Sequence, residues 1–228
     1  MVKVLKGYST KKDGSMILSA YGFSVENIRN RKRFFAGRRL AEYNSIAASL
    51  AHGTNISVID HNSKGFVLDT DALVTRESGI ILTLTGADCF PVYFEEKKAG
   101  IIGIAHCGWR GIVSGIIPKI INVILERGGS VEHLYVTIGP GICKKHFEIQ
   151  EKDSVSFAEF PEAVIRGKTL TVDLKKIIRA QARQAGVLRK HMTDTKECTY
   201  CLSEKYFSYR RDKPEHLETQ VAYIVMPK

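Results

Sequence analysis

The sequence predicts a single α/β (α+β) layered domain with a mixed β-sheet flanked by helices. Two observations indicate this class. Apolar segments of strand length alternate with segments of helical periodicity, and several strand-like segments are apolar at every position, as is typical of sheets covered on both faces. No repeat or linker interrupts the 228 residues and only six are proline, so we expect one domain over residues 1–228.

The N-terminal part of the chain is predicted to form three elements. They are a strand over residues 2–6 and helices over residues 25–35 and 40–51. Ser24 stands where an N-cap is needed, because its hydroxyl can accept a hydrogen bond from a free backbone N–H group of the first helix. Gly53 suits the left-handed conformation that ends a helix, which places His52 at the end of the second helix.

Strands dominate the centre of the chain. They are predicted over residues 56–59, 72–75, 80–85, 91–94 and 101–105. Isoleucines at helical spacing then predict a helix between Gly108 and Gly128. Pro118 fits if the regular helix begins near Ile117, since a proline is tolerated in a first turn. The last predicted elements are a strand over residues 134–138, a helix over 173–184 and a strand over 221–225.

Composition excludes several protein classes. With 44% hydrophobic and 25% charged residues, the chain can bury a full core. Its longest apolar runs are far shorter than the roughly 20 residues of a membrane-spanning helix. The N-terminus has no apolar stretch of signal-peptide length, and the five cysteines are an odd number. We therefore expect a cytoplasmic protein whose cysteines are free thiols or metal ligands.

The positive charge is concentrated near the N-terminus. The formal net charge is +10, and residues 1–40 contain ten basic and two acidic side chains. This balance favours anionic partners such as phosphate-bearing metabolites, nucleic acid or an acidic surface, or else describes a solvated basic face. No nucleic-acid-binding motif accompanies it, so a nucleic-acid partner is not expected.

Two short segments contain the residues best suited to chemistry. Thr85–Cys89 and Ala105–Gly111 each follow a predicted apolar strand, where side chains leave the core and enter a cleft. Cys89 and His106 are separated by one strand out and one strand back, so they can meet in space. A thiolate and an imidazole that meet either bind a metal ion or act as nucleophile and base. His52 would supply a third ligand and leave the fourth zinc position to water.

Several motifs occur in a fixed order along the chain. They are Ala51–Gly53, Asp71–Thr75, Ala87–Pro91, His106–Gly111, Ile138–Ile142 with Phe147 and Glu148, Cys198–Cys201 and Phe207–Asp212. Together they resemble the laccase-domain, or YfiH-like, family. This family is associated with multicopper polyphenol oxidation, purine nucleoside phosphorolysis and adenosine deamination. The resemblance extends from about His52 to Asp212.

The resemblance implies a fold, a metal site and an activity. The fold would be of the YfiH/CNF-like cysteine-hydrolase type, and His52, Cys89 and His106 match the zinc ligands of the family, with copper as the alternative ion. The implied enzyme is a zinc-dependent purine nucleoside phosphorylase (a transferase) with adenosine deaminase (hydrolase) activity. Its partners would be purine nucleosides, including adenosine and inosine, and inorganic phosphate. A membrane partner is not expected, and the protein would be a monomer or a homodimer.

Charged side chains near these motifs are candidates for substrate binding and proton transfer. Guanidinium groups bind phosphate in a bidentate manner, so we expect Arg110, Arg210 and Arg211 to bind phosphate unless they form structural ion pairs. Asp88 and Glu148 are the carboxylates available to transfer a proton. The catalytic candidates are therefore Cys89, His106, Asp88, Arg110 and Glu148.

The other cysteines have simpler interpretations. Cys198 and Cys201 form a lone Cys-x-x-Cys without a second pair, which favours a packed turn over a metal site. Cys107 is expected to be buried and inert, and Cys143 and His146 are expected to be loop residues near the cleft.

Three other functions fit parts of the pattern. Without a metal, Cys89 activated by His106 would make the protein a cysteine hydrolase. A copper polyphenol oxidase would need more histidine ligands than the one set found. A basic nucleic-acid-binding module would use the N-terminal charge and would not need Cys89 or His106.

Overall fold

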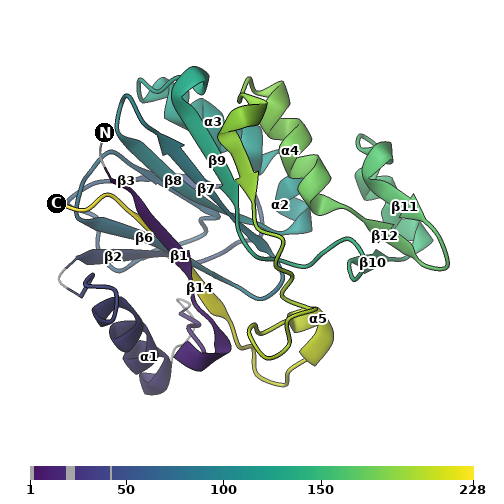
Figure 1. The fold of residues 1–228 in the computed structure, drawn as a ribbon, viewed down its shortest axis with the longest axis horizontal. Coiled ribbons are helices and arrows are strands. Elements are labelled where there is room, and N and C mark those ends of the chain that lie inside the picture. The colour runs from purple at the N-terminus through teal and green to yellow at the C-terminus, as the bar shows by residue number, and fades with distance from the viewer. Residues whose placement is uncertain (1–2, 19–23, 42) are drawn as a thin grey trace.

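A computed structural model describes residues 3–18, 24–41 and 43–228 of the chain. Its centre consists of two β-sheets packed face to face (Figure 1). The first sheet has the strand order β1-β14-β6-β2-β4. The strands are β1 Leu5–Tyr8, β14 Gln220–Val225, β6 Ile80–Gly86, β2 Asn44–Ala48 and β4 Phe66–Val67. Because β6 pairs antiparallel with β14 and parallel with β2, this sheet is mixed, as predicted.

The second sheet has six strands in the order β13-β9-β7-β8-β5-β3. They are β13 Met192–Asp194, β9 Leu134–Ile138, β7 Phe90–Glu96, β8 Ile101–Cys107, β5 Ala72–Thr75 and β3 Ile56–Ile59. This sheet is also mixed, since β7 and β8 are antiparallel whereas β3 and β5 are parallel. A small third sheet lies at one end of the molecule (Figure 1). Its strands are β10 Glu148–Ile149, β12 Leu170–Val172 and β11 Val164–Arg166.

Helices cover the outer faces of the two large sheets, so the molecule has four layers (Figure 1). The helix α1 Val25–Ala36 packs on the first sheet. The helices α2 Trp109–Val113, α3 Ile116–Glu126 and α4 Leu174–Gln184 pack on the second. The short α5 Tyr209–Asp212 follows a loop near the C-terminus. Short 3-10 helices cover Lys11–Asp13, Val131–His133, Glu151–Phe157, Pro161–Ala163 and Arg189–His191.

Side chains that point alternately to the two faces of a strand explain why each large sheet is covered on both sides. In β6, Ile81 faces Phe34 of α1, whereas Leu82 faces the second sheet and packs in the same cluster as Ile104. Successive side chains of a strand point to opposite faces, so a strand that is apolar at both positions must be covered on both sides. The prediction of doubly covered strands is therefore confirmed.

Most predicted elements are confirmed. The strands over residues 56–59, 72–75 and 134–138 match their predicted bounds, and the Ser24 hydroxyl accepts a hydrogen bond from the Asn27 backbone N–H group at 3.1 Å. The helix α3 begins at Ile116, one residue before the predicted start, and so keeps Pro118 in its first turn. The predicted strand over residues 2–6 is shifted, since β1 spans Leu5–Tyr8; Val2 lies outside the described residues.

The predicted helix over residues 40–51 is wrong. Residues Asn44–Ala48 form β2, which pairs with β6 on one side and with β4 on the other. The pairing covers residues 44–47 on the β6 side and residues 47–48 on the β4 side. The tertiary context therefore overrides a weak helical periodicity.

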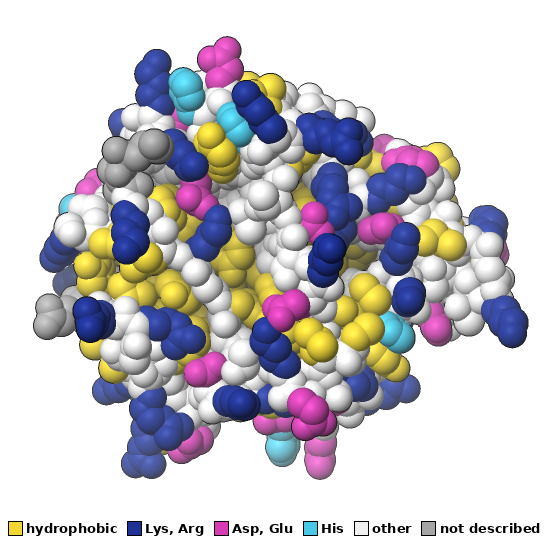
Figure 2. All heavy atoms as spheres, viewed as in Figure 1, with side chains coloured by type: hydrophobic (Ala, Val, Ile, Leu, Met, Phe, Trp, Pro, Cys, Tyr) yellow, Lys and Arg dark blue, Asp and Glu magenta, His cyan; other side chains and the backbone are white. Residues whose placement is uncertain are grey.

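None of the described helices is long and apolar enough to cross a bilayer. On the face shown in Figure 2, Lys and Arg side chains are scattered among acidic and apolar ones.

Candidate active site

The three predicted metal ligands converge around one glycine. A Cβ atom placed on Gly108 would lie 3.2 Å from Cys89 Sγ, 3.5 Å from His106 Cε1 and 3.8 Å from His52 Cδ2. The rings of His52 and His106 have centroids 4.9 Å apart and are nearly perpendicular. All three side chains line a cavity of about 360 Å³. The three side chains therefore line one cavity, and their role as metal ligands stays a prediction.

The strand arrangement positions two of these side chains. Cys89 directly precedes β7, and His106 lies near the end of β8, where it pairs with Pro91 across the antiparallel ladder. His52 lies in the loop that follows β2, not at a helix end, and adopts the left-handed conformation with a φ of 59°. Such a φ is costly for a residue with a side chain, so surrounding contacts must hold it.

Asp71 makes those contacts. Its fully buried carboxylate accepts hydrogen bonds from the backbone N–H groups of His52 at 2.7 Å and Gly53 at 2.8 Å. One of its oxygens also lies 3.8 Å from Nδ1 of His106. A single carboxylate thus positions both imidazole-bearing residues. The sequence analysis placed Asp71 in a motif but gave it no role; the available signal was an acidic residue directly before an apolar strand.

The electrostatics of the two imidazoles differ. Burial would lower the pKa of His106, but the nearby negative charges of Cys89 and Asp71 raise it to about 9. Burial lowers the pKa of His52 below its ordinary value, and the nearby His106 and Arg110 act in the same direction.

The donor set fits a divalent metal ion. One sulfur and two imidazoles suit Zn²⁺, and catalytic zinc sites use three protein ligands. The buried Nδ1 atom of His106 has no hydrogen-bond partner and faces Asp71, which leaves Nε2 for an ion; a carboxylate behind the imidazole is the usual support of a metal ligand. The trio is not among the described ligand sets whose atoms all lie within 4.8 Å of one another. Binding therefore requires the three side chains to move closer together.

Asp88 lies in the same cavity wall but is fully engaged. Its carboxylate accepts hydrogen bonds from Thr199 Oγ1 at 2.6 Å, Ser208 Oγ at 3.0 Å and the Arg210 backbone N–H group at 2.7 Å. Its φ of 94° is unfavourable for a residue with a side chain. The geometry therefore favours a positioning role for Asp88 over the predicted role in proton transfer.

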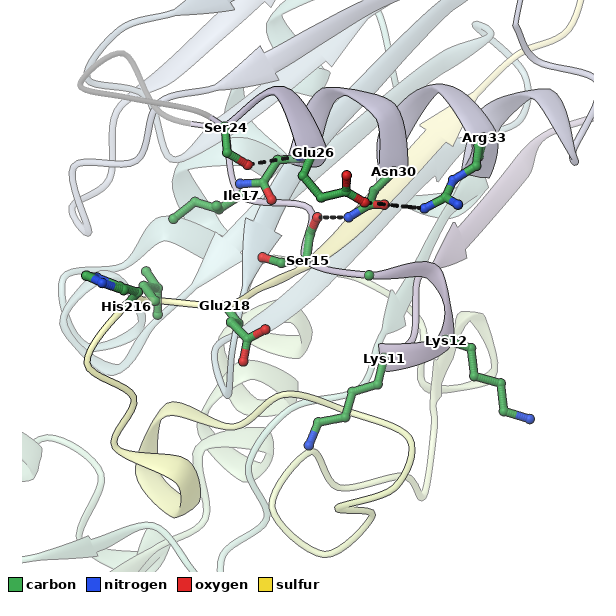
Figure 3. A pocket seen from close by; sticks show the side chains of 13 residues that line it. Lys11, Lys12, Ser15, Ile17, Ser24, Glu26, Asn30, Arg33, His216 and Glu218 are labelled. Carbon is green, nitrogen blue, oxygen red and sulfur yellow. Dashed lines mark hydrogen bonds and ion pairs between the residues drawn. The ribbon is translucent and has the colours of Figure 1, made fainter.

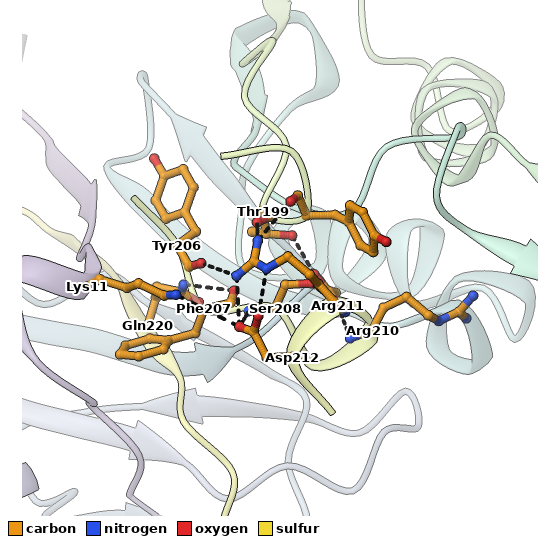
Figure 4. Close-up of polar contacts among 11 residues, drawn as sticks. Lys11, Thr199, Tyr206, Phe207, Ser208, Arg210, Arg211, Asp212 and Gln220 are labelled. Carbon is orange, nitrogen blue, oxygen red and sulfur yellow. Dashed lines mark hydrogen bonds and ion pairs between the residues drawn. The ribbon is translucent and has the colours of Figure 1, made fainter. Parts of the chain in front are cut away.

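Of the three predicted phosphate-binding arginines, Arg211 has different surroundings from Arg110 and Arg210. Arg211 donates to the carbonyl oxygens of Thr199, Tyr200 and Tyr206 and to the Asp212 carboxylate (Figure 4). These contacts occupy its guanidinium group. The structural interpretation is therefore favoured for Arg211, and phosphate binding is not.

Arg110 and Arg210 lie together at a second cavity of about 500 Å³, which Glu148 also lines. The exposed Arg110 stacks on Trp109 at 4.6 Å, and Arg210 Nη1 donates to the Glu148 carbonyl oxygen at 2.9 Å. Trp109 and Phe147 line both this cavity and the one with the predicted ligands. The two cavities are therefore neighbours that share an aromatic wall.

The remaining cysteines fall into two groups. Cys107 is fully buried, as predicted, and burial raises the pKa of its thiol. In contrast, the Cys198–Cys201 turn is not isolated. The ligand atoms of Cys143, His146 and Cys201 all lie within 4.8 Å of one another, a group that the sequence analysis did not bring together.

A larger, open cavity of about 820 Å³ lies between α1 and the C-terminal loop (Figure 3). Lys11, Lys12 and Arg33 line it together with Glu26 and Glu218, so acidic groups offset its basic ones. None of the predicted site residues lines it.

The chain is similar in sequence to proteins named purine nucleoside phosphorylase or adenosine deaminase. It is 32% identical over 202 residues to purine nucleoside phosphorylase YlmD of Geobacillus stearothermophilus, covering 77% of this chain and 72% of that protein. It is 32% identical over 179 residues to mouse purine nucleoside phosphorylase LACC1, covering 72% of this chain but only 41% of that protein. It is 29% identical over 175 residues to adenosine deaminase RL5 of an unknown prokaryote, covering 70% and 67%.

Solved structures and a family profile agree with these matches. The crystal structure of YlmD from Geobacillus stearothermophilus superposes with a TM-score of 0.92 at 26% identity, covering 99% of this chain and 92% of that one. Bacillus licheniformis YfiH has the same fold, with a TM-score of 0.91 at 23% identity and coverage of 98% and 92%. The mixed α/β fold is thus confirmed, whereas the cysteine-hydrolase subtype finds no support in these neighbours. Since the profile described as multi-copper polyphenol oxidoreductase laccase matches residues 22–227, the chain belongs to that family.

Proposed function

We propose that the chain, as one domain over residues 1–228, is a zinc-dependent enzyme that acts on purine nucleosides. Its reactions would be phosphorolysis of the N-glycosidic bond and hydrolytic deamination of adenosine. The observation that carries the proposal is the convergence of His52, Cys89 and His106 around Gly108, with Asp71 behind both histidines. The relatives named purine nucleoside phosphorylase and adenosine deaminase supply the reaction classes.

The residues of one cavity would bind the metal ion, and those of the neighbouring cavity would bind phosphate. His52, Cys89 and His106 would hold the ion, which would supply a Lewis acid and lower the pKa of water toward 7. Trp109 and Phe147 form the shared wall against which a flat purine nucleoside can pack. Arg110 and Arg210 would hold phosphate, whose oxygen attacks C1′ of the ribose while the bond to the purine nitrogen breaks.

Glu148 is the carboxylate that we assign to proton transfer. It is exposed at the second cavity, whereas the Asp88 carboxylate already accepts three hydrogen bonds. A carboxylate with free oxygens can take a proton from the attacking water or deliver one to the leaving group. Asp88 would instead position Arg210 by accepting its backbone N–H group.

The proposal is tested with zinc-loaded protein, adenosine and phosphate, with hypoxanthine, adenine and inosine separated by chromatography. We expect adenine from phosphorolysis and inosine from deamination, and His106→Ala should reduce both to background because it removes a ligand. Identical traces for the wild type and His106→Ala would contradict the assignment. A metal-free preparation that stays active and is inactivated by thiol alkylation would point to a cysteine nucleophile instead.

A second prediction separates phosphate binding from metal chemistry. We expect Arg110→Ala to raise the KM for phosphate by about tenfold, because a charge-assisted hydrogen bond is worth roughly 1.5–3 kcal/mol. Deamination of adenosine uses no phosphate and should keep its rate. The same measurements on Arg166→Ala, a surface arginine paired with Glu151, provide the matched control. An unchanged KM for phosphate in Arg110→Ala would remove Arg110 from the phosphate site.

A further inference from the structure

Two turns far apart in the sequence have the same spacing of metal-ligating residues. One carries Cys143 and His146, and the other carries Cys198 and Cys201. In the first, the His146 backbone N–H group donates to the Cys143 carbonyl oxygen at 3.0 Å, and in the second the Leu202 N–H group donates to the Cys198 carbonyl oxygen at 3.0 Å. Pairs of ligands separated by two residues on tight turns are typical of structural zinc sites.

The backbone brings the two turns together. Gly141 and Cys198 form an isolated parallel β-bridge, and the Thr199 N–H group donates to the Gly141 carbonyl oxygen at 3.2 Å. The Cys143 backbone N–H group donates to Cys198 Sγ at 3.2 Å. The sulfur of Cys198 is therefore oriented toward the first turn by a hydrogen bond that does not depend on a metal.

Three of the four side chains are spaced as a metal ion requires, and Cys198, whose sulfur lies beside the Cys143 backbone, would close on the ion as the fourth ligand. Cys143 Sγ and Cys201 Sγ are 4.0 Å apart, and with a ring nitrogen of His146 they form a set of atoms within 4.8 Å of one another. A zinc–sulfur distance of about 2.3 Å in a tetrahedron places neighbouring sulfurs about 3.8 Å apart. The His146 ring is held by stacking on Tyr200, with centroids 4.0 Å apart.

We propose that Cys143, His146, Cys198 and Cys201 form a second metal site that binds Zn²⁺. Three sulfurs and one imidazole are soft and borderline donors that favour zinc over calcium or magnesium. Four protein ligands leave no position for water, so this ion would stabilise structure and take no part in the chemistry. The site shares no ligand with the His52, Cys89 and His106 set and is independent of the proposed function.

The position of this second site indicates what the ion would stabilise. The first turn is attached to Asp88, because the Ile142 backbone N–H group donates to the Asp88 carbonyl oxygen at 2.8 Å. The second turn is attached to the same residue through Thr199 Oγ1. Ile142 and Phe147 line the candidate active-site cavity. An ion shared by the two turns would therefore fix one wall of that cavity.

Metal analysis of the purified protein, prepared without chelator and measured by mass spectrometry, tests the proposal. We expect Cys201→Ser to contain one zinc equivalent less than the wild type. Cys89→Ser should keep the ion of the second site, so its cobalt-substituted form should show the absorption of cobalt–thiolate bonds. Cys107→Ala, which removes a thiol buried in the core, should keep the zinc content of the wild type.

A second measurement needs no variant. Cys201 is exposed, so iodoacetamide can reach its thiol when no metal is bound. Because partial burial and the neighbouring Cys198 and Cys143 raise the pKa of this thiol, the reaction is run at alkaline pH, where the thiolate forms. We expect peptide mapping of the native wild type to show Cys143, Cys198 and Cys201 protected from alkylation, and a chelator to expose them together. Rapid alkylation of Cys201 without chelator, a disulfide between Cys143 and Cys201, or equal zinc contents in the wild type and Cys201→Ser would overturn the proposal. Since the comparison is made at Cys201, a failure of the catalytic assignment leaves this result unaffected.

Discussion

Asp71→Asn is expected to weaken metal binding by His52, Cys89 and His106 by about 10- to 100-fold, the effect typical of losing a group that orients a ligand. The Asp71 carboxylate has two oxygens and accepts the N–H groups of both His52 and Gly53. An asparagine has one oxygen, so its amide N–H₂ group would face one of these donors. His52 then loses support for its left-handed backbone, and His106 loses the charge beside Nδ1.

The measurement is zinc titration against a competing chelator, combined with thermal denaturation of the metal-free protein. We expect the unfolding free energy to fall by about 1–3 kcal/mol, because a buried donor is left without a partner. Asp60→Asn is the matched control, since Asp60 also accepts backbone N–H groups, those of Asn62 and Ser63, but in an exposed loop. Equal zinc affinities for the wild type and Asp71→Asn would show that Asp71 does not support the metal site.

The central strands and the convergence of His52, Cys89 and His106 were predictable because the local sequence pattern there favours the same structure that the packing of the folded protein requires. Residues 72–75 are buried at every position, with side chains in the clusters on both faces of the sheet. Residues 134–138 alternate instead and bury Leu134, Val136 and Ile138 on the helix-covered face. Cys89 and His106 face each other because the segment between them is a simple antiparallel hairpin, β7 and β8. The sequence shows both features directly.

Features that depend on distant partners could not be predicted. Residues 44–48 become a strand because β6 and β4 lie on either side of them. The ion pair of Arg211 with the adjacent Asp212 was one of the expected alternatives, but its bonds to the carbonyl oxygens of Thr199 and Tyr200 depend on a loop that the neighbouring sequence does not reveal. The turns that carry Cys143 and Cys198 are 55 residues apart, and only the packing of their backbones shows that each completes the other.

Gly108→Ala is expected to prevent metal binding without unfolding the protein. The added Cβ would lie 3.2 Å from Cys89 Sγ and within 4 Å of both histidine rings, between the three proposed ligands. The backbone itself tolerates alanine, because Gly108 has a φ of −72° and a ψ of 160° at the N-terminus of α2. The methyl group would crowd Cys89 Sγ and occupy the space into which the three ligands must close around an ion. Because a misplacement of about 1 Å can cost roughly a hundredfold in rate, we expect at least that loss in both reactions.

The test combines zinc content, activity and thermal stability of Gly108→Ala with the same measurements on Gly37→Ala. Gly37 is also at a helix end with an ordinary φ, and its added Cβ would have its nearest neighbour at 3.5 Å, away from the site. We expect Gly37→Ala to keep wild-type zinc content and activity. We expect Gly108→Ala to melt like the metal-free wild type and to lose the zinc of this site while keeping that of the second one. Full activity and zinc content in Gly108→Ala would mean that the ion does not bind where these three side chains converge, because an alanine there leaves no room for them to close on it.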